Sequence, residues 1–134
     1  MSSEFGLPRT AIVTGGARRI GAMLVRALAA DGWHVAIHCN SSRAEADALC
    51  AELHAAGQGA HVIVADLADA DSAAQIVAQA QDGAPPLGML VNNASRFDYD
   101  TISDFDVAGW DRHLDVNLRA PALLTQAFAA ALPE

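Results

Sequence analysis

Short runs of β-favouring residues alternate with helical stretches along this chain, and this alternation limits the folds open to it more than any other feature. The runs lie at 10–15, 34–39, 60–66 and 87–95, and apolar residues at helical spacing follow each of them. Strands separated by helices of about ten to fifteen residues form βαβ units with a parallel sheet. Right-handed crossovers then place helices on both faces. The sequence predicts one half of a doubly wound α/β fold, truncated after the helix that follows the fourth strand.

Capping residues indicate where the helices begin and end. Gly32 ends the first helix, because glycine readily adopts the left-handed conformation that often follows a last helical turn. A capping box that starts at Ser42 opens the second helix, and Gly57 ends it. Asp69 caps the third helix, and the segment 103–106 opens the last. We see no internal repeat and expect residues 1–134 to form a single domain.

Composition argues against several classes of function. The 134 residues carry a net charge of −8, which opposes binding to a nucleic-acid backbone. The apolar runs are too short to span a bilayer, and the N-terminus lacks the basic and apolar regions of a secretion signal. These features predict a cytoplasmic protein with no membrane and no nucleic-acid partner. Because the sequence contains no lysine, Schiff-base chemistry and lysine-assisted acid catalysis cannot come from these residues.

The cysteines and histidines do not have the spacing of a metal site. Cys39 and Cys50 lie in unlike contexts without CxxC spacing, as expected of reduced, buried thiols. His34 and His38 are four residues apart, but on a strand that spacing does not make them adjacent ligands. We therefore expect no metal.

The segment TGGARRIG, residues 14–21, links the first expected strand to the first expected helix. Gly15 allows a tight turn, and Gly21 allows the helix to pack closely on the sheet. The helix N-terminus offers free N–H groups and a positive dipole end to a pyrophosphate. A turn and close packing alone would also explain the glycines. However, Arg18 and Arg19 oppose the helix dipole at this end, which favours an anionic partner over two solvated side chains.

Three motifs in the same order resemble the short-chain dehydrogenase/reductase family. TGGARRIG resembles the family's TGxxxGxG, with Arg19 at the position of the middle glycine. NNAS, residues 92–95, resembles the family's NNAG, and Asn117 in DVNLRAP matches its helix asparagine. The resemblance runs from Arg9 to about Pro133 and implies a Rossmann-like fold, of which this chain is the N-terminal part.

Within the family the chain is most similar to the pteridine reductase branch. That branch shares an arginine at the position of Arg19, NNAS in place of NNAG, and a segment like HCNSSRAEADAL, residues 38–49. The ketoacyl reductase branch usually has glycine at the Arg19 position and is the alternative. The resemblance implies hydride transfer from NADPH to a small-molecule substrate, a pterin or a carbonyl compound.

The end of the second expected strand indicates which nucleotide binds. NAD-binding versions of this fold place a carboxylate there, whereas this strand ends in HCNSSR, residues 38–43, without one. Hydroxyl groups, N–H groups and arginine suit the 2′-phosphate of NADP. Ser42 could instead serve only as a helix N-cap. The branch tends to have arginine at the position of Ser41, and whether Arg43 substitutes for it stays open.

The resemblance also implies the cofactor's other contacts. Arg19 and the 40–42 loop would surround the 2′-phosphate, within reach of Arg18. Asp66, which can also cap the turn that follows it, would frame the adenine with Leu67. The NNAS segment would lie along the ribose. The predicted cofactor residues are Gly15, Arg18, Arg19, Ile20, Gly21, Asn40, Ser41, Ser42, Asp66, Leu67, Asn93, Ala94 and Ser95.

The proton donor of the family is missing from these residues. In the family it is the tyrosine of a YxxxK motif, whereas the only tyrosine here is Tyr99, with serine four residues later. Because the protein supplies orientation and a proton while the nicotinamide supplies the hydride, we expect the chain to be inactive alone. A non-catalytic dinucleotide-binding module is the alternative.

Two further residues have expected roles in an intact enzyme. Asn117 is the predicted catalytic residue: Pro121 has no N–H, so the Asn117 carbonyl loses its helical partner and is free to bind a water of the proton relay. A packed kink is the alternative. Phe97 follows NNAS, where the resemblance places an aromatic ring that stacks on a pterin, although the ring could equally belong to the core.

The last feature concerns assembly. The resemblance implies the strand order 3-2-1-4, which leaves the fourth strand with an unpaired edge where the family continues its sheet. Trp110, Leu114 and Leu118 form an apolar stripe on the last helix. Open edges and uncovered apolar stripes favour association. We therefore expect the domain to be covered by the rest of its own polypeptide, or by a partner chain in a homo-oligomer.

Overall fold

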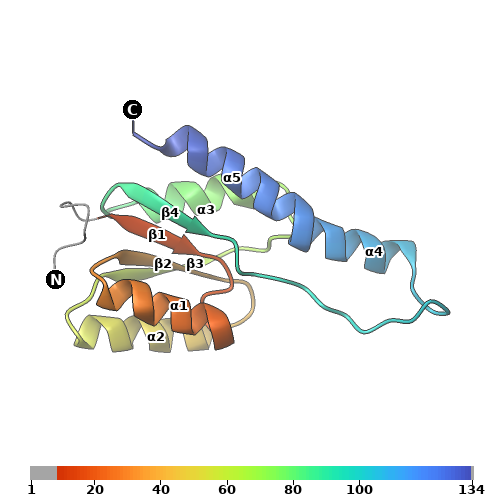
Figure 1. Cartoon of the computed structure of the whole chain (residues 1–134), viewed down its shortest axis with the longest axis horizontal. Coiled ribbons are helices and arrows are strands. Elements are labelled where there is room, and N and C mark those ends of the chain that lie inside the picture. The colour runs from red at the N-terminus through yellow and green to blue at the C-terminus, as the bar shows by residue number, and fades with distance from the viewer. Residues whose placement is uncertain (1–8, 134) are drawn as a thin grey trace.

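The computed structural model describes residues 9–133 and contains one four-stranded parallel sheet. Its strands lie in the order β3-β2-β1-β4, as the sequence predicts (Figure 1). Every neighbouring pair is parallel. The strands are β1 (Thr10–Val13), β2 (His34–Cys39), β3 (Ala60–Val64) and β4 (Leu87–Val91).

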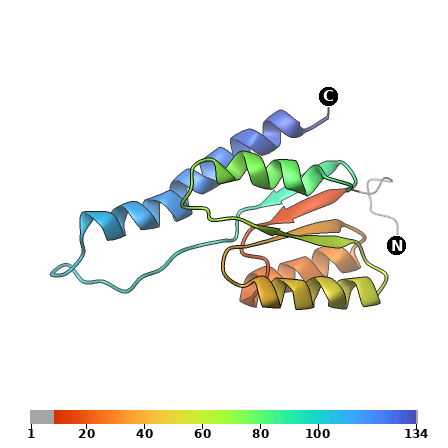
Figure 2. The same cartoon turned by 180° about the vertical axis from the view of Figure 1, so that it is seen from behind.

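Helices cover both faces of the sheet. Figures 1 and 2 show α1 and α2 on one face and α3 and α5 on the other, so the doubly wound prediction is confirmed. The helix α4 and the π-helical turn η1 continue into α5 and project beyond the sheet. Among the described residues, no helix is both long enough and apolar enough to cross a membrane. The bounds are α1 (Arg19–Ala30), α2 (Arg43–Ala55), α3 (Ser72–Gln81), α4 (Val107–Leu114), η1 (Asp115–Arg119) and α5 (Ala120–Ala131).

The central strand β1 separates two apolar layers. Successive side chains of a strand point to opposite faces. Ala11 and Val13 accordingly join the core beneath α1 and α2, whereas Ile12 joins the core beneath α3 and α5. Such burial on both faces explains why the strand is apolar without alternation.

Two predicted helix caps are wrong. Ser42 precedes α2, but its side chain makes no capping hydrogen bond, because its backbone (φ −89°, ψ 45°) is not in the extended conformation typical of an N-cap. Asp69 lies before the N-cap of α3, and its carboxylate accepts the Asp71 N–H within the preceding turn. The start of the last helical segment is confirmed, since Asp106 caps α4 by accepting the Gly109 N–H at 2.6 Å.

The core beneath α3 gives a direct test of this packing. Ile76 is 0% exposed and belongs to the same core as Ile12, whereas Ile102 is 91% exposed. We expect Ile76→Ala to lower the free energy of unfolding by about 2–5 kcal/mol through lost burial and a residual cavity. The matched control Ile102→Ala should change it by less than about 0.5 kcal/mol. Urea denaturation measures both, and equal effects would contradict the assigned core.

Candidate dinucleotide-binding site

An open groove of about 690 Å³ lies where β1, β2 and β4 end. In open α/β sheets, ligands bind beyond the carboxyl ends of the strands, near the point where strand order reverses. Here the reversal falls at β1, between β2 and β4. All the predicted cofactor residues except Asp66 line the groove. The lining also includes residues that the sequence did not single out: Ala17, His38, Cys39, Arg96 and Val116.

Two glycines of the 14–21 loop have a steric requirement. Gly15 has φ +59°, a left-handed conformation that glycine adopts freely. A Cβ at Gly21 would collide with the Gly15 carbonyl oxygen and lie 2.7 Å from Asn93 Nδ2. The first turn of α1 therefore packs against the loop and against Asn93 so closely that a side chain at position 21 does not fit.

Arg19 has a φ of +51°, and among the described residues it is the only non-glycine residue with positive φ. This conformation costs an L-residue with a side chain about 1–2 kcal/mol. Arg19 lines the groove at the start of α1. Strain of this kind persists mainly where a site uses the residue, so it is a pointer to function.

A row of hydrogen bonds crosses the carboxyl edge of the sheet and joins all four strand ends. Asn93 Nδ2 donates to the Thr14 and Gly15 carbonyl oxygens, each at 3.1 Å. The Gly15 N–H donates to His38 Nδ1 at 3.1 Å, and His38 Nε2 donates to the Ala65 carbonyl oxygen at 2.9 Å. We call these four bonds the carboxyl-edge network. It fixes the glycine-rich loop relative to β2, β3 and β4.

His38 is the member of this network that sequence reasoning missed. It is 2% exposed, and because a carbonyl can only accept, its Nε2 carries the proton and its Nδ1 is the acceptor. Burial lowers the pKa of His38, although the bond to Ala65 opposes this shift. The ring is therefore neutral at neutral pH. Local sequence does not distinguish His38 from His34, which begins the same strand.

The β2 end of the groove carries Asn40, Ser41 and Ser42. Arg43 is not in the lining, because its Nε donates to both carboxylate oxygens of Asp47, at 2.9 and 3.0 Å. The structure thus holds the Arg43 side chain against α2 instead of at the Ser41 position.

The described lining of the groove has an excess of positive charge. Its charged side chains are the arginines Arg18, Arg19 and Arg96, and no carboxylate is among them. Arg96 is paired with Asp98 outside the lining at 2.7 Å, so Arg18 and Arg19 carry the excess. The free N–H groups of the first turn of α1 add a partial positive charge at the same place. An anionic group is therefore the ligand for which this groove is suited electrostatically.

The NNAS segment is held by side chains on both sides. The Thr14 hydroxyl accepts the N–H groups of Asn93 and Ala94, each at 3.0 Å. Farther along, Asn117 Oδ1 accepts the Arg96 N–H at 2.7 Å, and Asn117 Nδ2 donates to the Arg96 carbonyl oxygen at 2.9 Å. The predicted catalytic asparagine thus also positions the loop after NNAS, which the sequence did not indicate.

The helix around Asn117 is irregular where proline removes a donor. The Ala120 N–H donates to the Asp115 carbonyl oxygen, five residues back, within the π-helical turn η1. Pro121 follows directly and has no N–H to contribute. Such π-turns occur frequently at functional sites, in keeping with the expected break in the helix.

Phe97 is 81% exposed, so within the described residues it is not part of the core. The backbone of both neighbours is held by a hydrogen bond. The Arg96 N–H donates to Asn117 Oδ1, and the Asp98 N–H donates to His113 Nε2 at 2.9 Å. The backbone on either side of the ring is therefore anchored to α4 and η1 while the ring itself is free to contact a ligand.

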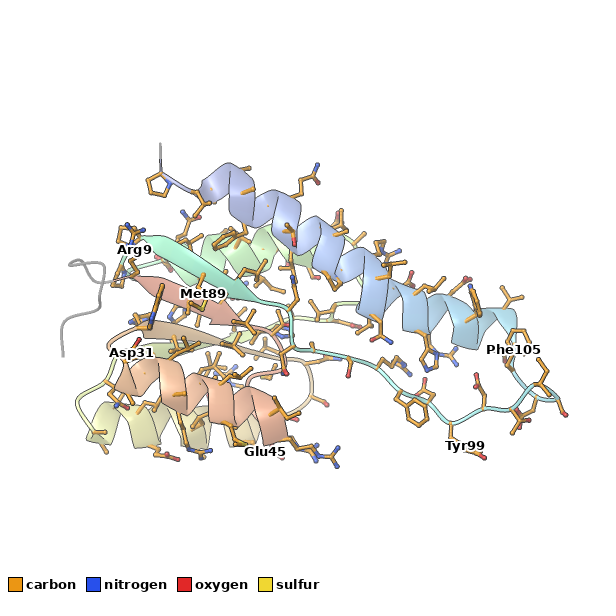
Figure 3. The ribbon with its side chains drawn as sticks, viewed as in Figure 1. Arg9, Asp31, Glu45, Met89, Tyr99 and Phe105 are labelled. Atoms are coloured by element: carbon orange, nitrogen blue, oxygen red, sulfur yellow. The ribbon has the colours of Figure 1, made fainter. Side chains whose placement is uncertain are left out.

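Three of the predicted site residues, Asp66, Phe97 and Asn117, lie outside the groove lining. Asp66 Oδ1 accepts the Ala68 N–H at 2.9 Å, so its carboxylate caps the turn after β3. Tyr99 is exposed on the long loop beyond the sheet, which has Phe105 at its far end (Figure 3).

Comparison with known proteins agrees with this geometry. Residues 9–134 match the family model described as short chain dehydrogenase. The short-chain dehydrogenase/reductase FrzI of Cladobotryum sp is 39% identical over 121 residues, which cover 90% of this chain and 47% of FrzI. The 3-oxoacyl-(acyl-carrier-protein) reductase FabG of Staphylococcus aureus is 31% identical over 113 residues, or 84% of this chain and 46% of FabG.

Solved structures give the same result. FolM alternative dihydrofolate reductase 1 from Brucella canis, complexed with NADP, matches with a TM-score of 0.88 and 44% identity. The match covers 94% of this chain and 50% of that one. The chain therefore belongs to the short-chain dehydrogenase family. It spans about half the length of the curated relatives it matches.

The close contact at Gly21 predicts a large effect of one methyl group. We expect Gly21→Ala to lower the free energy of unfolding by about 3 kcal/mol or more, because the obstacle is backbone that must shift. Gly83→Ala is the control: Gly83 also has positive φ, but nothing lies within 4 Å of the added Cβ, so strain of about 1–2 kcal/mol is the whole cost. Thermal denaturation compares them, and an equal loss in both would contradict the packing described.

Proposed function

We propose that these residues form the NADP-binding part of a short-chain reductase that resembles the pteridine reductases. The bound cofactor would supply hydride for reduction of a pterin or a carbonyl substrate. The observation that carries the proposal is the composition of the groove. A strained arginine, a helix N-terminus and the carboxylate-free end of β2 line the same 690 Å³ space.

The 2′-phosphate is the group that the β2 end of the groove suits. Arg19 would contribute charge and bidentate hydrogen bonds, and Asn40, Ser41 and Ser42 would contribute neutral donors. Because Asp47 holds Arg43, the second cation at this place would be Arg18. A carboxylate at this strand end would instead favour the ribose hydroxyls of NAD.

The rest of the cofactor would extend along the groove toward β4. The pyrophosphate would lie over the first turn of α1, near Gly15, Ile20 and Gly21. Leu67 would contact the adenine, with Asp66 fixing the turn beside it. The ribose on the nicotinamide side would lie along residues 93–95.

The substrate would meet the Phe97 ring, and Asn117 would join the proton relay through its carbonyl oxygen. The exposure of Phe97 and the anchoring of its neighbours by Asn117 and His113 support this arrangement. The general acid and its lysine are not among these 134 residues, which contain no lysine. A homo-oligomer partner or further polypeptide would cover the exposed stripe of Trp110 and Leu118.

A 3-oxoacyl reductase is the second candidate, favoured by the similarity to FabG of Staphylococcus aureus. The 44% identity to FolM of Brucella canis and the arginine at position 19 favour the pterin branch. Assaying the longer polypeptide with a dihydropterin and with an acetoacetyl thioester separates the two. Binding of NADPH without reduction of either substrate would favour a non-catalytic dinucleotide-binding module.

Arg19 offers a test in which stability and binding move in opposite directions. We expect Arg19→Gly to leave stability unchanged or raise it by up to about 1 kcal/mol, because the relieved strain slightly exceeds the backbone entropy of glycine. Affinity for NADPH should fall about tenfold or more through loss of a charge-assisted contact, while affinity for NADH should not change.

Fluorescence titration and urea denaturation measure these two quantities. The control is Arg26→Ala on the same helix, where Arg26 pairs with Glu52 and does not line the groove. That variant should retain its preference for NADPH. Equal affinities of the unmodified chain for NADPH and NADH would contradict the NADP assignment.

The 134-residue chain alone should bind NADPH weakly and reduce nothing. Loss of a positioned general acid typically costs about a hundredfold to ten-thousandfold in rate, and loss of the substrate pocket adds to this. The measurement is NADPH consumption with a dihydropterin at high protein concentration. Turnover above the protein-free rate would contradict this prediction.

A further inference from the structure

The side chain of His38, in β2, joins the glycine-rich loop to the segment after β3. Its ring accepts the Gly15 N–H and donates to the Ala65 carbonyl oxygen. Its own carbonyl oxygen accepts the Gly16 N–H at 2.9 Å. Both glycine amides at the start of the loop are therefore bound by His38, which leaves the later amides and the first turn of α1 to bind a ligand.

The ring can hold the loop in one protonation state only. An imidazole with a proton on Nε2 has one acceptor, Nδ1, and the Gly15 N–H uses it. In the imidazolium both nitrogens are donors, so an Nδ1–H would face the Gly15 N–H at a donor-to-donor distance of 3.1 Å. Gly15 would then have to move, and its positive φ would change with it.

The charged and titratable groups around His38 do not replace this arrangement. Arg18 and Arg19 lie on the loop above it, Asp66 follows Ala65, and Cys39 is its neighbour in β2. Asp66 Oδ1 accepts the Ala68 N–H, and the carboxylate is not among the partners of the His38 ring. Burial raises the pKa of Cys39, so that thiol is uncharged at neutral pH. The hydrogen-bonding partners of the ring are thus two backbone groups, neither of which can titrate.

We infer that His38 is a positioning residue for the dinucleotide: only its neutral form holds Gly15 in the conformation that binds the pyrophosphate, so protonation of His38 weakens cofactor binding. This inference rests on the proposed function, since it requires that the groove binds NADP. Binding and proton release are then linked. The affinity should fall with a limiting slope of about tenfold per pH unit below the pKa of His38.

The experiment compares NADP⁺ binding to the full chain and to His38→Gln by calorimetry between pH 8 and pH 5. A glutamine amide offers one acceptor and one donor and does not titrate, so it can keep both bonds. Protonation of the cofactor's phosphate, with a pKa of about 6, affects binding to both proteins equally. The ratio of their dissociation constants therefore reports the effect of His38 protonation alone. The ratio should be constant above pH 7 and rise as the pH falls.

The outcomes separate the two proposals. A ratio that stays constant over the whole range would overturn the role of His38 and leave the NADP assignment intact. Absence of binding to either protein at any pH would overturn the proposed function. If His38→Gln does not fold, ¹⁵N NMR of the unmodified chain replaces it. Saturating NADP⁺ should lower the pH at which His38 titrates, and an unchanged or raised midpoint would overturn the inference.

Discussion

The carboxyl-edge network is the constraint on which the rest of this structure depends. A parallel sheet aligns the ends of its strands but does not fix the loops that leave them. Here the side chains of His38 in β2 and Asn93 after β4 form hydrogen bonds with backbone atoms of the neighbouring strand ends. The loop after β1 is thereby held between His38 and Asn93, and the N-terminus of α1 points into the groove as a consequence.

The same loop also contains Arg19, where the proposed role in binding would oppose stability. Gly15 and Gly21 satisfy steric requirements of the fold, whereas Arg19 occupies a conformation that glycine would adopt at lower cost. For a turn alone, glycine would be the more stable residue at this position. An arginine there is explained if it binds an anionic group, and no carboxylate in the described lining would repel that group.

The fold and most of the groove could be predicted from local sequence. The alternation of strands and helices predicts the parallel sheet, and the family resemblance supplies the strand order. Loops that follow such strands converge at one edge. The roles of His38 and of the Asn117 side chain could not be predicted, because their partners, Gly15 and Arg96, lie 23 and 21 residues away. Hydrogen bonds over such separations depend on the final packing and leave no periodic signal.

Local rules failed in another way at Ser42 and Asp69, and they left the partner of Arg43 open. At all three positions the sequence does not show what the side chain binds. Asp69 closes a turn instead of capping α3, and Arg43 pairs with Asp47 one helical turn later. Ser42 keeps its place before α2, but its side chain makes no capping bond and lines the groove.

We propose that the edge held by this network binds a dinucleotide phosphate. Mapping amide chemical-shift changes on a ¹⁵N-labelled chain during titration with NADP⁺ gives a residue-by-residue test. We expect saturable changes at Gly15, Arg19, Ser41 and Asn93. The opposite end of the sheet, where His34 and His61 share a hydrogen bond, should not respond. Changes centred on that opposite end, or no saturable changes at all, would contradict the account.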